Sequence, residues 1–265
     1  MIIRQSLTIS SLFLILFGSQ TASGEQASFN GSKTETVSAR VVCGNFTITE
    51  SSDQSIHVKT EKVRWANYCS YNTKVSGSKI SLKITENKIL RGNKDCCEMN
   101  FEIKIPANKS LDIKSTAGTN SISAQLDSVR IKNSAGSLDI SNSKINTLDF
   151  DLAGGNVSVK KSTIPKSEGK IGGGNFEGNG LFNEFSMKQG AGNFDLTLEK
   201  IPAEGFVSIN AGSGNISISL PKGSKIDADI KKSIGNFENF FPQTSGAKFK
   251  LKINSGIGNT SIKQI

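Results

Sequence analysis

A short turn motif, Gly-x-Gly-Asn or a close variant, recurs along the last two thirds of the chain, within residues that alternate apolar and polar. The glycines that precede the Asn position are 19, 19, 18, 22, 21 and 23 residues apart. They are Gly136, Gly155, Gly174, Gly192, Gly214, Gly235 and Gly258. A repeat of about this length is one supersecondary unit that cannot bury its apolar face alone. The units are therefore predicted to stack into one layered β structure.

Each Gly-Asn pair is expected to form the corner of a β-coil. A corner needs a positive φ, which Gly reaches freely and Asn tolerates. Stacked Asn side chains can also hydrogen-bond to the coils above and below. The predicted structural corners are Gly155 with Asn156, Gly174 with Asn175, Gly192 with Asn193, Gly214 with Asn215, Gly235 with Asn236, and Gly258 with Asn259.

Strands of period two lead into and out of these corners. Val207 and Ile209 precede Gly214, and Ile216 and Ile218 follow it. No segment has a helical period, so the predicted fold class is all-β: a right-handed, single-stranded β-solenoid (β-helix) with a disulfide-bearing N-terminal cap region. Its coils would pair in parallel at about 4.8 Å per step. A closed antiparallel barrel or sandwich also alternates, but the constant place of Gly-Asn favours the solenoid.

The first residues are typical of a secretory signal. Arg4 is followed by an apolar stretch over residues 7–17, and Ala22 and Gly24 offer small residues at a cleavage site. We therefore predict a signal peptide over residues 1–24, and export to the periplasm, the cell surface or the medium. The apolar stretch is shorter than the roughly 20 residues of a spanning helix, so no membrane span is expected.

The rest of the chain divides into three predicted parts. Residues 25–35 lack a pattern and are interpreted as a flexible lead-in. Residues 36–105 form an N-terminal β region with a cysteine-bearing cap, and residues 106–265 form the solenoid repeats.

The four cysteines are Cys43, Cys69, Cys96 and Cys97. An even number of cysteines in an exported chain predicts disulfides, and three pairings are possible. A bond between the neighbours Cys96 and Cys97 is strained, so each is expected to pair with Cys43 or Cys69. The same region holds Trp65, Tyr68 and Tyr71, which are expected to cap one end of the stack.

The charge points to acidic ligands. The sequence has 32 Lys and Arg against 23 Asp and Glu, and loss of Arg4 with the signal peptide would leave 31 against 23, or +8. Lys248, Lys250 and Lys252 form a single-sided stripe and are the candidate ligand-binding residues. The expected partner is an anionic polysaccharide or a protein of the envelope or cell surface. No nucleic acid, cofactor or metal site is expected, and the oligomeric state is left open.

An enzyme is the alternative hypothesis. Asp149 and Asp151 are two residues apart on one strand, as are Asp227 and Asp229, and such pairs point the same way about 6.5–7 Å apart. They would serve a polysaccharide-degrading enzyme of the β-helix type. A solvated polar face is the simpler interpretation. The single histidine, His57, is interpreted as a solvent-facing strand position rather than a catalytic base.

Three aromatic residues lie close together near the C-terminus: Phe237, Phe240 and Phe241. We expect them to cover the open end of the solenoid, which would otherwise expose a sheet edge. A patch that docks a partner is the other interpretation.

The segment from Phe101 through Pro106 and Leu111 to Gly118, together with the Gly-x-Gly-Asn units after it, resembles the bacterial putative-adhesin domain family, relatives of the head GIN domain. The resemblance extends from about Thr36 to residue 265. It implies a right-handed β-solenoid, and it supplies no catalytic residues. It implies an exported, non-enzymatic adhesin-like or scaffolding protein that binds envelope or cell-surface ligands through its outer faces.

Overall fold

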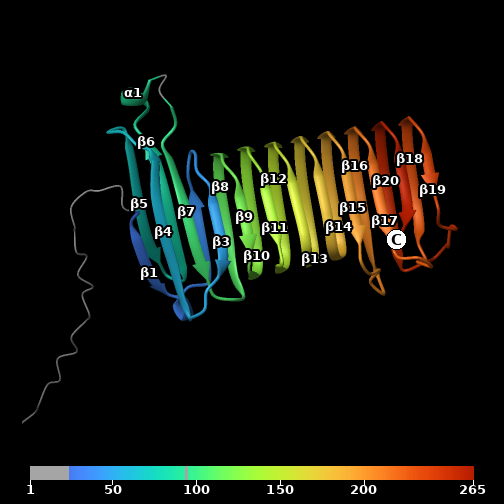
Figure 1. Cartoon of the computed structure of the whole chain (residues 1–265), viewed down its shortest axis with the longest axis horizontal. Coiled ribbons are helices and arrows are strands. Elements are labelled where there is room, and N and C mark those ends of the chain that lie inside the picture. Colours follow the sequence, from blue (N-terminus) through green and yellow to red (C-terminus); the bar gives the residue numbers. More distant parts are fainter. Residues whose placement is uncertain (1–23, 93–94) are drawn as a thin grey trace, which may run out of the picture.

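The computed structural model describes residues 24–92 and 95–265. All but one residue of the predicted signal peptide lie outside this range. The strands lie side by side along one axis and build a rod (Figure 1). Among the described residues, no helix is long and apolar enough to cross a membrane.

The N-terminal part contains β1 (Gln26–Asn30), the 3-10 helix η1 (Gly31–Lys33), β2 (Thr36–Arg40), β3 (Phe46–Glu50), β4 (Ser55–Arg64), β5 (Cys69–Ser76), β6 (Lys79–Glu86), helix α1 (Lys88–Arg91) and β7 (Glu98–Ile105). The remainder contains β8 (Lys109–Ala117), β9 (Asn120–Ser123), β10 (Gln125–Ala135), β11 (Leu138–Ser141), β12 (Lys144–Gly154), β13 (Val157–Gly173), β14 (Phe176–Ala191), β15 (Phe194–Leu198), β16 (Gly205–Ser213), β17 (Ile216–Leu220), β18 (Asp227–Ile234), β19 (Phe237–Asn239), β20 (Phe249–Ile257) and β21 (Thr260–Gln264).

The strands pair in two ladders. The first ladder runs β5, β6, β2, β8, β10, β12, the later half of β13, the later half of β14, β16, β20 and β18. The second ladder runs β1, β4, β7, β3, β9, β11, the early half of β13, the early half of β14, β15, β17, β21 and β19. Among the strands of the described residues, only the pairs β1–β4, β4–β7 and β5–β6 are antiparallel. The predicted all-β solenoid with parallel coils is confirmed.

Alternation decides which side chains enter the core between the two ladders. On β14, for example, Phe185 and Met187 are at most 1% exposed, while the next residue, Lys188, is exposed. On β16, Val207 and Ile209 are likewise at most 1% exposed. Phenylalanine rings from successive coils also stack inside the rod: the Phe176 ring centroid lies 4.9 Å from that of Phe194. The core is therefore one continuous column rather than a set of separate clusters.

The predicted glycine corners form one column along the rod. Nine corner glycines have φ between 122° and 148°: Gly44, Gly118, Gly136, Gly155, Gly174, Gly192, Gly214, Gly235 and Gly258. Each packs against the corner of the neighbouring coil. A Cβ added to Gly174, for example, would overlap the carbonyl oxygen of Gly155. Glycine is required here for two reasons, the backbone conformation and the close approach of the next coil.

The predicted asparagine stack is confirmed. The backbone N–H of Asn175 donates to Asn156 Oδ1 at 2.9 Å, and that of Asn193 donates to Asn175 Oδ1 at 2.9 Å. The backbone N–H of Asn215 donates to Asn193 Oδ1 at 3.1 Å. Each side chain thus satisfies a peptide group of the next corner, which has no strand partner of its own at that point.

Order along the chain differs from order along the rod at both ends. The coil of β20 and β21, last in the sequence, lies between the coil of β16 and β17 and that of β18 and β19. The asparagine stack follows the same path, because Asn259 donates to Asn215 and Asn236 donates to Asn259. At the other end, the coil of β2 and β3 lies between β6–β7 and β8–β9. The glycine spacing does not reveal these two exchanges.

Two predicted segment boundaries differ from the structure. The expected flexible lead-in over residues 25–35 is wrong: β1 pairs with β4 over all five of its residues, and Phe29 packs against the core. Its alternation was too short to recognise by sequence alone. The parallel stack also includes β2 and β3, so it begins before the predicted start at residue 106.

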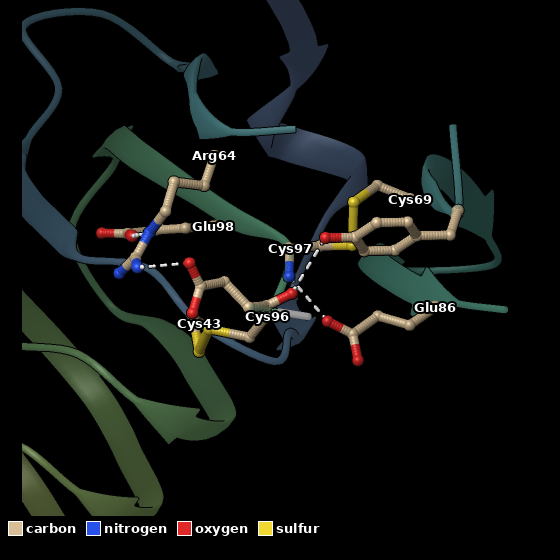
Figure 2. The surroundings of a disulfide bond; sticks show 9 residues. Cys43, Arg64, Cys69, Glu86, Cys96, Cys97 and Glu98 are labelled. Carbon is tan, nitrogen blue, oxygen red and sulfur yellow. Dashed lines mark hydrogen bonds and ion pairs between the residues drawn. A yellow bond between two sulfur atoms is a disulfide. The ribbon is translucent and has the colours of Figure 1, made fainter. Parts of the chain in front are cut away.

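Two disulfides hold the N-terminal region together, as predicted, and neither joins the neighbouring cysteines. They are Cys43–Cys96 and Cys69–Cys97. Figure 2 shows both bonds meeting in the segment before β7, next to the Arg64–Glu98 ion pair, whose Nε–Oε2 distance is 2.7 Å. The Cys97 N–H also donates to Glu86 Oε1 at 2.6 Å. As expected, Trp65, Tyr68 and Tyr71 pack against this end of the core.

The corner column makes a matched pair of glycine substitutions informative. Gly174→Ala should lower the free energy of unfolding by about 3 kcal/mol or more, because a left-handed φ costs about 1–2 kcal/mol and the new methyl group overlaps Gly155. Gly173→Ala should change it by less than about 1 kcal/mol, because a Cβ there has nothing within 4 Å. Denaturant unfolding measures both. Equal losses for the two variants would contradict the role of the column.

The disulfides should stabilise the end of the rod rather than its repeats. Replacing Cys69 and Cys97 with Ala should lower stability by about 2–5 kcal/mol in the chain-entropy model. Hydrogen exchange should accelerate in β5 and β6 and stay slow in β12 to β14, because these coils share no loop with the bond. Uniform acceleration along the whole rod would contradict this prediction.

Candidate functional site

One outward position of the first ladder carries a cation in most coils. In order along the rod it is occupied by Lys83, Arg40, Lys114, Lys132, Asp151, Lys170, Lys188, Asn210, Asn254 and Lys231. Seven of these ten residues are Lys or Arg, and we call the ten the cation column. Parallel pairing in register brings successive members to about 4.8 Å between backbones.

The cations of this column lie on the outer surface, and Asp151 is the one acidic residue among the ten. Lys114 is half-buried and the other six are exposed. Among residues 24–92 and 95–265, no ion pair within 4.0 Å includes any of them. Like charges opposite each other on neighbouring strands destabilise a sheet. Four consecutive cations, from Lys83 to Lys132, therefore form a concentrated positive field that an anionic ligand would relieve.

A shallow groove runs beside the part of the cation column from Asp151 to Lys231. Its floor is made of small residues two positions further along each strand, among them Ala153, Gly172, Gly190, Gly212 and Gly256. Two hollows along this groove share Asn210 as a lining residue, so they are continuous. Short side chains therefore leave Lys170, Lys188 and Lys231 open along one side.

The outer face of the second ladder has the opposite character. One outward position there is occupied along the rod by Glu102, Thr47, Ser121, Asp139, Ser158, Glu177, Asp195, Ser217, Ser261 and Glu238. From β7 to β19, carboxylates and hydroxyls fill this position. Lysines of this ladder lie elsewhere, among them Lys59 opposite Glu102, and Lys104, Lys160 and Lys263 two residues after this position.

The candidate stripe near the C-terminus lies on the same ladder but in a different setting. Lys250 and Lys252 point outward from β20, and the adjacent strand β18 places Asp227 opposite Lys250 and Asp229 opposite Lys252. Lys248 lies before β20, and its carbonyl oxygen accepts from the Gly205 N–H. Two of the three stripe lysines thus have an acidic neighbour in register, as Lys132 and Lys170 of the cation column do on either side of Asp151.

The aspartate pairs of the enzyme hypothesis lie on the same open face. Asp149 accepts from Arg130 Nε at 2.9 Å, and Asp151 lies between Lys132 and Lys170. Asp227 Oδ1 accepts from Gln243 Nε2 at 2.8 Å. Each carboxylate therefore has a cationic or amide neighbour on an outward sheet surface rather than a place in an enclosed cleft.

His57 faces outward on β4, as the alternation predicted. Its Nε2 lies 3.0 Å from Asp53 Oδ1, and its Nδ1 lies 3.2 Å from Ser28 Oγ on the neighbouring strand β1. The Ser55 N–H and His57 together lower the pKa of Asp53. Ser28 and Asp53 are exposed. A catalytic triad of Ser, His and Asp acts in a water-excluded site with oxyanion donors. These three residues lie at the surface instead, so we interpret them as a hydrogen-bonded cluster that joins neighbouring strands.

The sequence contains a pattern that predicts the cation column, and it differs from the Lys248, Lys250 and Lys252 stripe that was predicted. From Arg40 to Lys231, every member lies four residues before a corner glycine, as Lys170 precedes Gly174 and Lys188 precedes Gly192. Aligning the units on that glycine reveals the recurrent cation. The groove floor was not predictable in the same way, because it depends on which side chains stay short in neighbouring coils.

These features define a β-solenoid with an outward row of cations on one ladder. The model of the Toastrack DUF4097 family matches residues 44–265. The chain belongs to this family, which confirms the resemblance inferred from its sequence. No curated protein matches the chain.

Several solved structures are similar to the chain at low identity. One, from Parabacteroides distasonis, is named a putative lipid binding protein: it is 15% identical, covers 92% of this chain and 97% of its own, and has a TM-score of 0.47. A putative adhesin from Bacteroides fragilis is 14% identical, with coverage of 92% and 98% and a TM-score of 0.38. A putative cell adhesion protein from Clostridium sporogenes is 13% identical, with coverage of 91% and 100% and a TM-score of 0.29.

Proposed function

We propose that this protein is an exported, non-enzymatic β-solenoid that binds an extended acidic polysaccharide of the cell envelope along its cation column. The observation that carries the proposal is the in-register row of Lys and Arg on one face of the rod. Two disulfides support an extracytoplasmic location, because such bonds persist in oxidising compartments.

The mechanism is multivalent and electrostatic. One exposed cation paired with one carboxylate contributes about 0.2–1 kcal/mol. A polymer that meets several cations in succession makes its later contacts at a high effective concentration, so weak contacts combine into useful affinity. The Debye length of about 8 Å at physiological salt exceeds the coil spacing, so neighbouring cations act together on one polymer.

The ligand is expected to be a polyanion without base recognition. The cation column contains no aromatic residue, and binding to single-stranded nucleic acid relies on aromatic side chains that stack on bases. The candidate stripe of Lys248, Lys250 and Lys252 extends the positive face toward the C-terminal end in this proposal. It is expected to contribute less than the cation column, because Asp227 and Asp229 lie beside it.

Charge reversal on the two faces tests the proposal. The triple variant Lys132→Glu, Lys170→Glu, Lys188→Glu should weaken binding to polygalacturonate at least about tenfold, because three attractions become repulsions. Binding is measured by retention on the immobilised polymer over a salt series, with neutral dextran as the blank. The wild-type affinity should fall steeply as salt rises.

The matched control carries the same change in net charge on the second ladder: Lys104→Glu, Lys160→Glu, Lys263→Glu. It should retain most of the binding, and a variant with Lys248, Lys250 and Lys252 changed to Glu should be intermediate. Equal losses in all three variants would mean that net charge alone attracts the polymer, which would contradict the proposal. Release of sugar during the incubation would favour the polysaccharide-degrading alternative instead.

A further inference from the structure

The two ends of the rod differ in their surface chemistry. At the C-terminal end, Phe241 is 4% exposed, while Phe237 is 39% exposed and Phe240 is 58% exposed. The predicted aromatic cover is therefore correct for Phe241 and wrong for Phe237 and Phe240. Lys232 lies in core register there and donates to the Gly235 carbonyl oxygen, and an inward charge of this kind discourages further strands at an edge. The N-terminal end carries a cluster of cations instead.

Four cations surround one serine side chain on the outer face of β6 and its two neighbours, β5 and β2, at the N-terminal end of the rod (Figure 1). Lys79 and Lys83 lie two residues before and after Ser81 on β6, and therefore on the same face as this residue. Lys74 of β5 lies opposite Ser81, and Arg40 of β2 lies opposite Lys83. We call the four cations and Ser81 the N-terminal basic cluster.

The N-terminal basic cluster borders a small hollow of about 260 Å³. The short side chains of Ser38 and Ser81 lie opposite each other across the two strands, and the longer side chains of Arg40, Lys79 and Lys83 line the same hollow. Pockets for drug-sized ligands measure about 300–1,000 Å³. The hollow is therefore suited to one small group rather than to a whole sugar chain.

The donors of the cluster are not used by other protein groups. Within the part of the chain that the structure describes, no ion pair within 4.0 Å includes any of the four cations. The Ser81 hydroxyl likewise has no hydrogen-bond partner among the described residues. Arg40, Lys74 and Lys83 are exposed and Lys79 is half-buried, so all four can reach a ligand.

Two carboxylates lie near the cluster and reduce its charge only in part. Asp112 of β8 accepts from Ser38 Oγ at 3.5 Å, and Glu35, just before β2, accepts from Ser78 Oγ at 3.2 Å. Four cations against these two carboxylates leave a net charge of +2. A phosphate monoester carries about −1.5 to −2 charges at pH 7, whereas a sugar carboxylate carries −1. The cluster therefore matches the phosphate better in charge.

We propose that the N-terminal basic cluster binds a phosphate monoester carried by a sugar of the envelope polysaccharide. The Arg40 guanidinium can bind two phosphate oxygens at once, the lysines act as point charges, and the Ser81 hydroxyl donates to a further oxygen. Arg40 and Lys83 also belong to the cation column. The inference thus rests on the proposed function for the polymer, and it adds a substituent that this end of the column recognises.

Glucose 6-phosphate tests the cluster separately from the polymer. The double variant Lys79→Gln, Lys83→Gln should raise its dissociation constant at least about tenfold, because two of the four cations are lost. Ser81→Ala should raise it about threefold or more, because one hydrogen bond to a charged group is lost. A titration followed by phosphorus NMR at physiological salt measures both. Glucuronate, with one charge, should compete at least about threefold more weakly than glucose 6-phosphate.

The matched control is Lys104→Gln, Lys263→Gln, which removes two charges from the second ladder. It should change the dissociation constant by less than about twofold, because exposed charges beyond the Debye length are screened. No saturable binding of glucose 6-phosphate to the wild-type protein would overturn the inference. Equal losses in the cluster variant and the control, or glucuronate competing as well as the phosphate, would overturn it too.

The triple variant Lys132→Glu, Lys170→Glu, Lys188→Glu separates this inference from the proposed function. It should lose polygalacturonate and keep most of its binding to glucose 6-phosphate. Wild-type retention on polygalacturonate without binding of the sugar phosphate would reject the phosphate site alone, and the reverse would reject the polymer and keep the site. Preference for vesicles that contain phosphatidic acid, lost in the cluster variant, would overturn the sugar as carrier and assign the phosphate to a lipid headgroup.

Discussion

The close contact between corner glycines of successive coils is the constraint on which the rest of the structure depends. Each corner has a positive φ and lies against the carbonyl oxygen of the next corner, as Gly192 lies against Gly174. A side chain there would hold the coils apart and break both ladders at once. Because the corners stack directly, the strands on either side of them are in register with those of the next coil. Each outward position therefore repeats as a straight row along the rod.

The two exchanged coils show how a solenoid can close without a separate capping domain. A strand at the end of the chain has one covalent connection and frays easily. Placing β2–β3 and β20–β21 one coil inside the stack gives each of them two neighbours instead of one. At the N-terminal end the ladders end in β5 and β1, and disulfides secure this region. At the other end they end in β18 and β19, and Gln243 contacts the first residues of β18.

Function on such a rod depends on register more than on any single residue. An isolated Lys170 or Lys188 is an ordinary solvated side chain. Parallel pairing sets Lys170 and Lys188 side by side and adds a floor of small residues beside them. The same rule explains why the aspartate pairs are poor candidates for catalysis: register gives them cationic neighbours on an open surface, as Arg130 neighbours Asp149.

The sequence by itself determined the all-β class, the glycine corners, the asparagine stack and the residues that enter the core. These follow from local chemistry, because φ > 0 selects glycine and alternation selects the buried face. Only the tertiary structure decided the order of the end coils, the disulfide pairing, the place of β1 and the extent to which Phe237 and Phe240 are covered. These depend on which coil lies next to which, and neither turn spacing nor alternation carries that information, since every coil presents nearly the same edge to its neighbours.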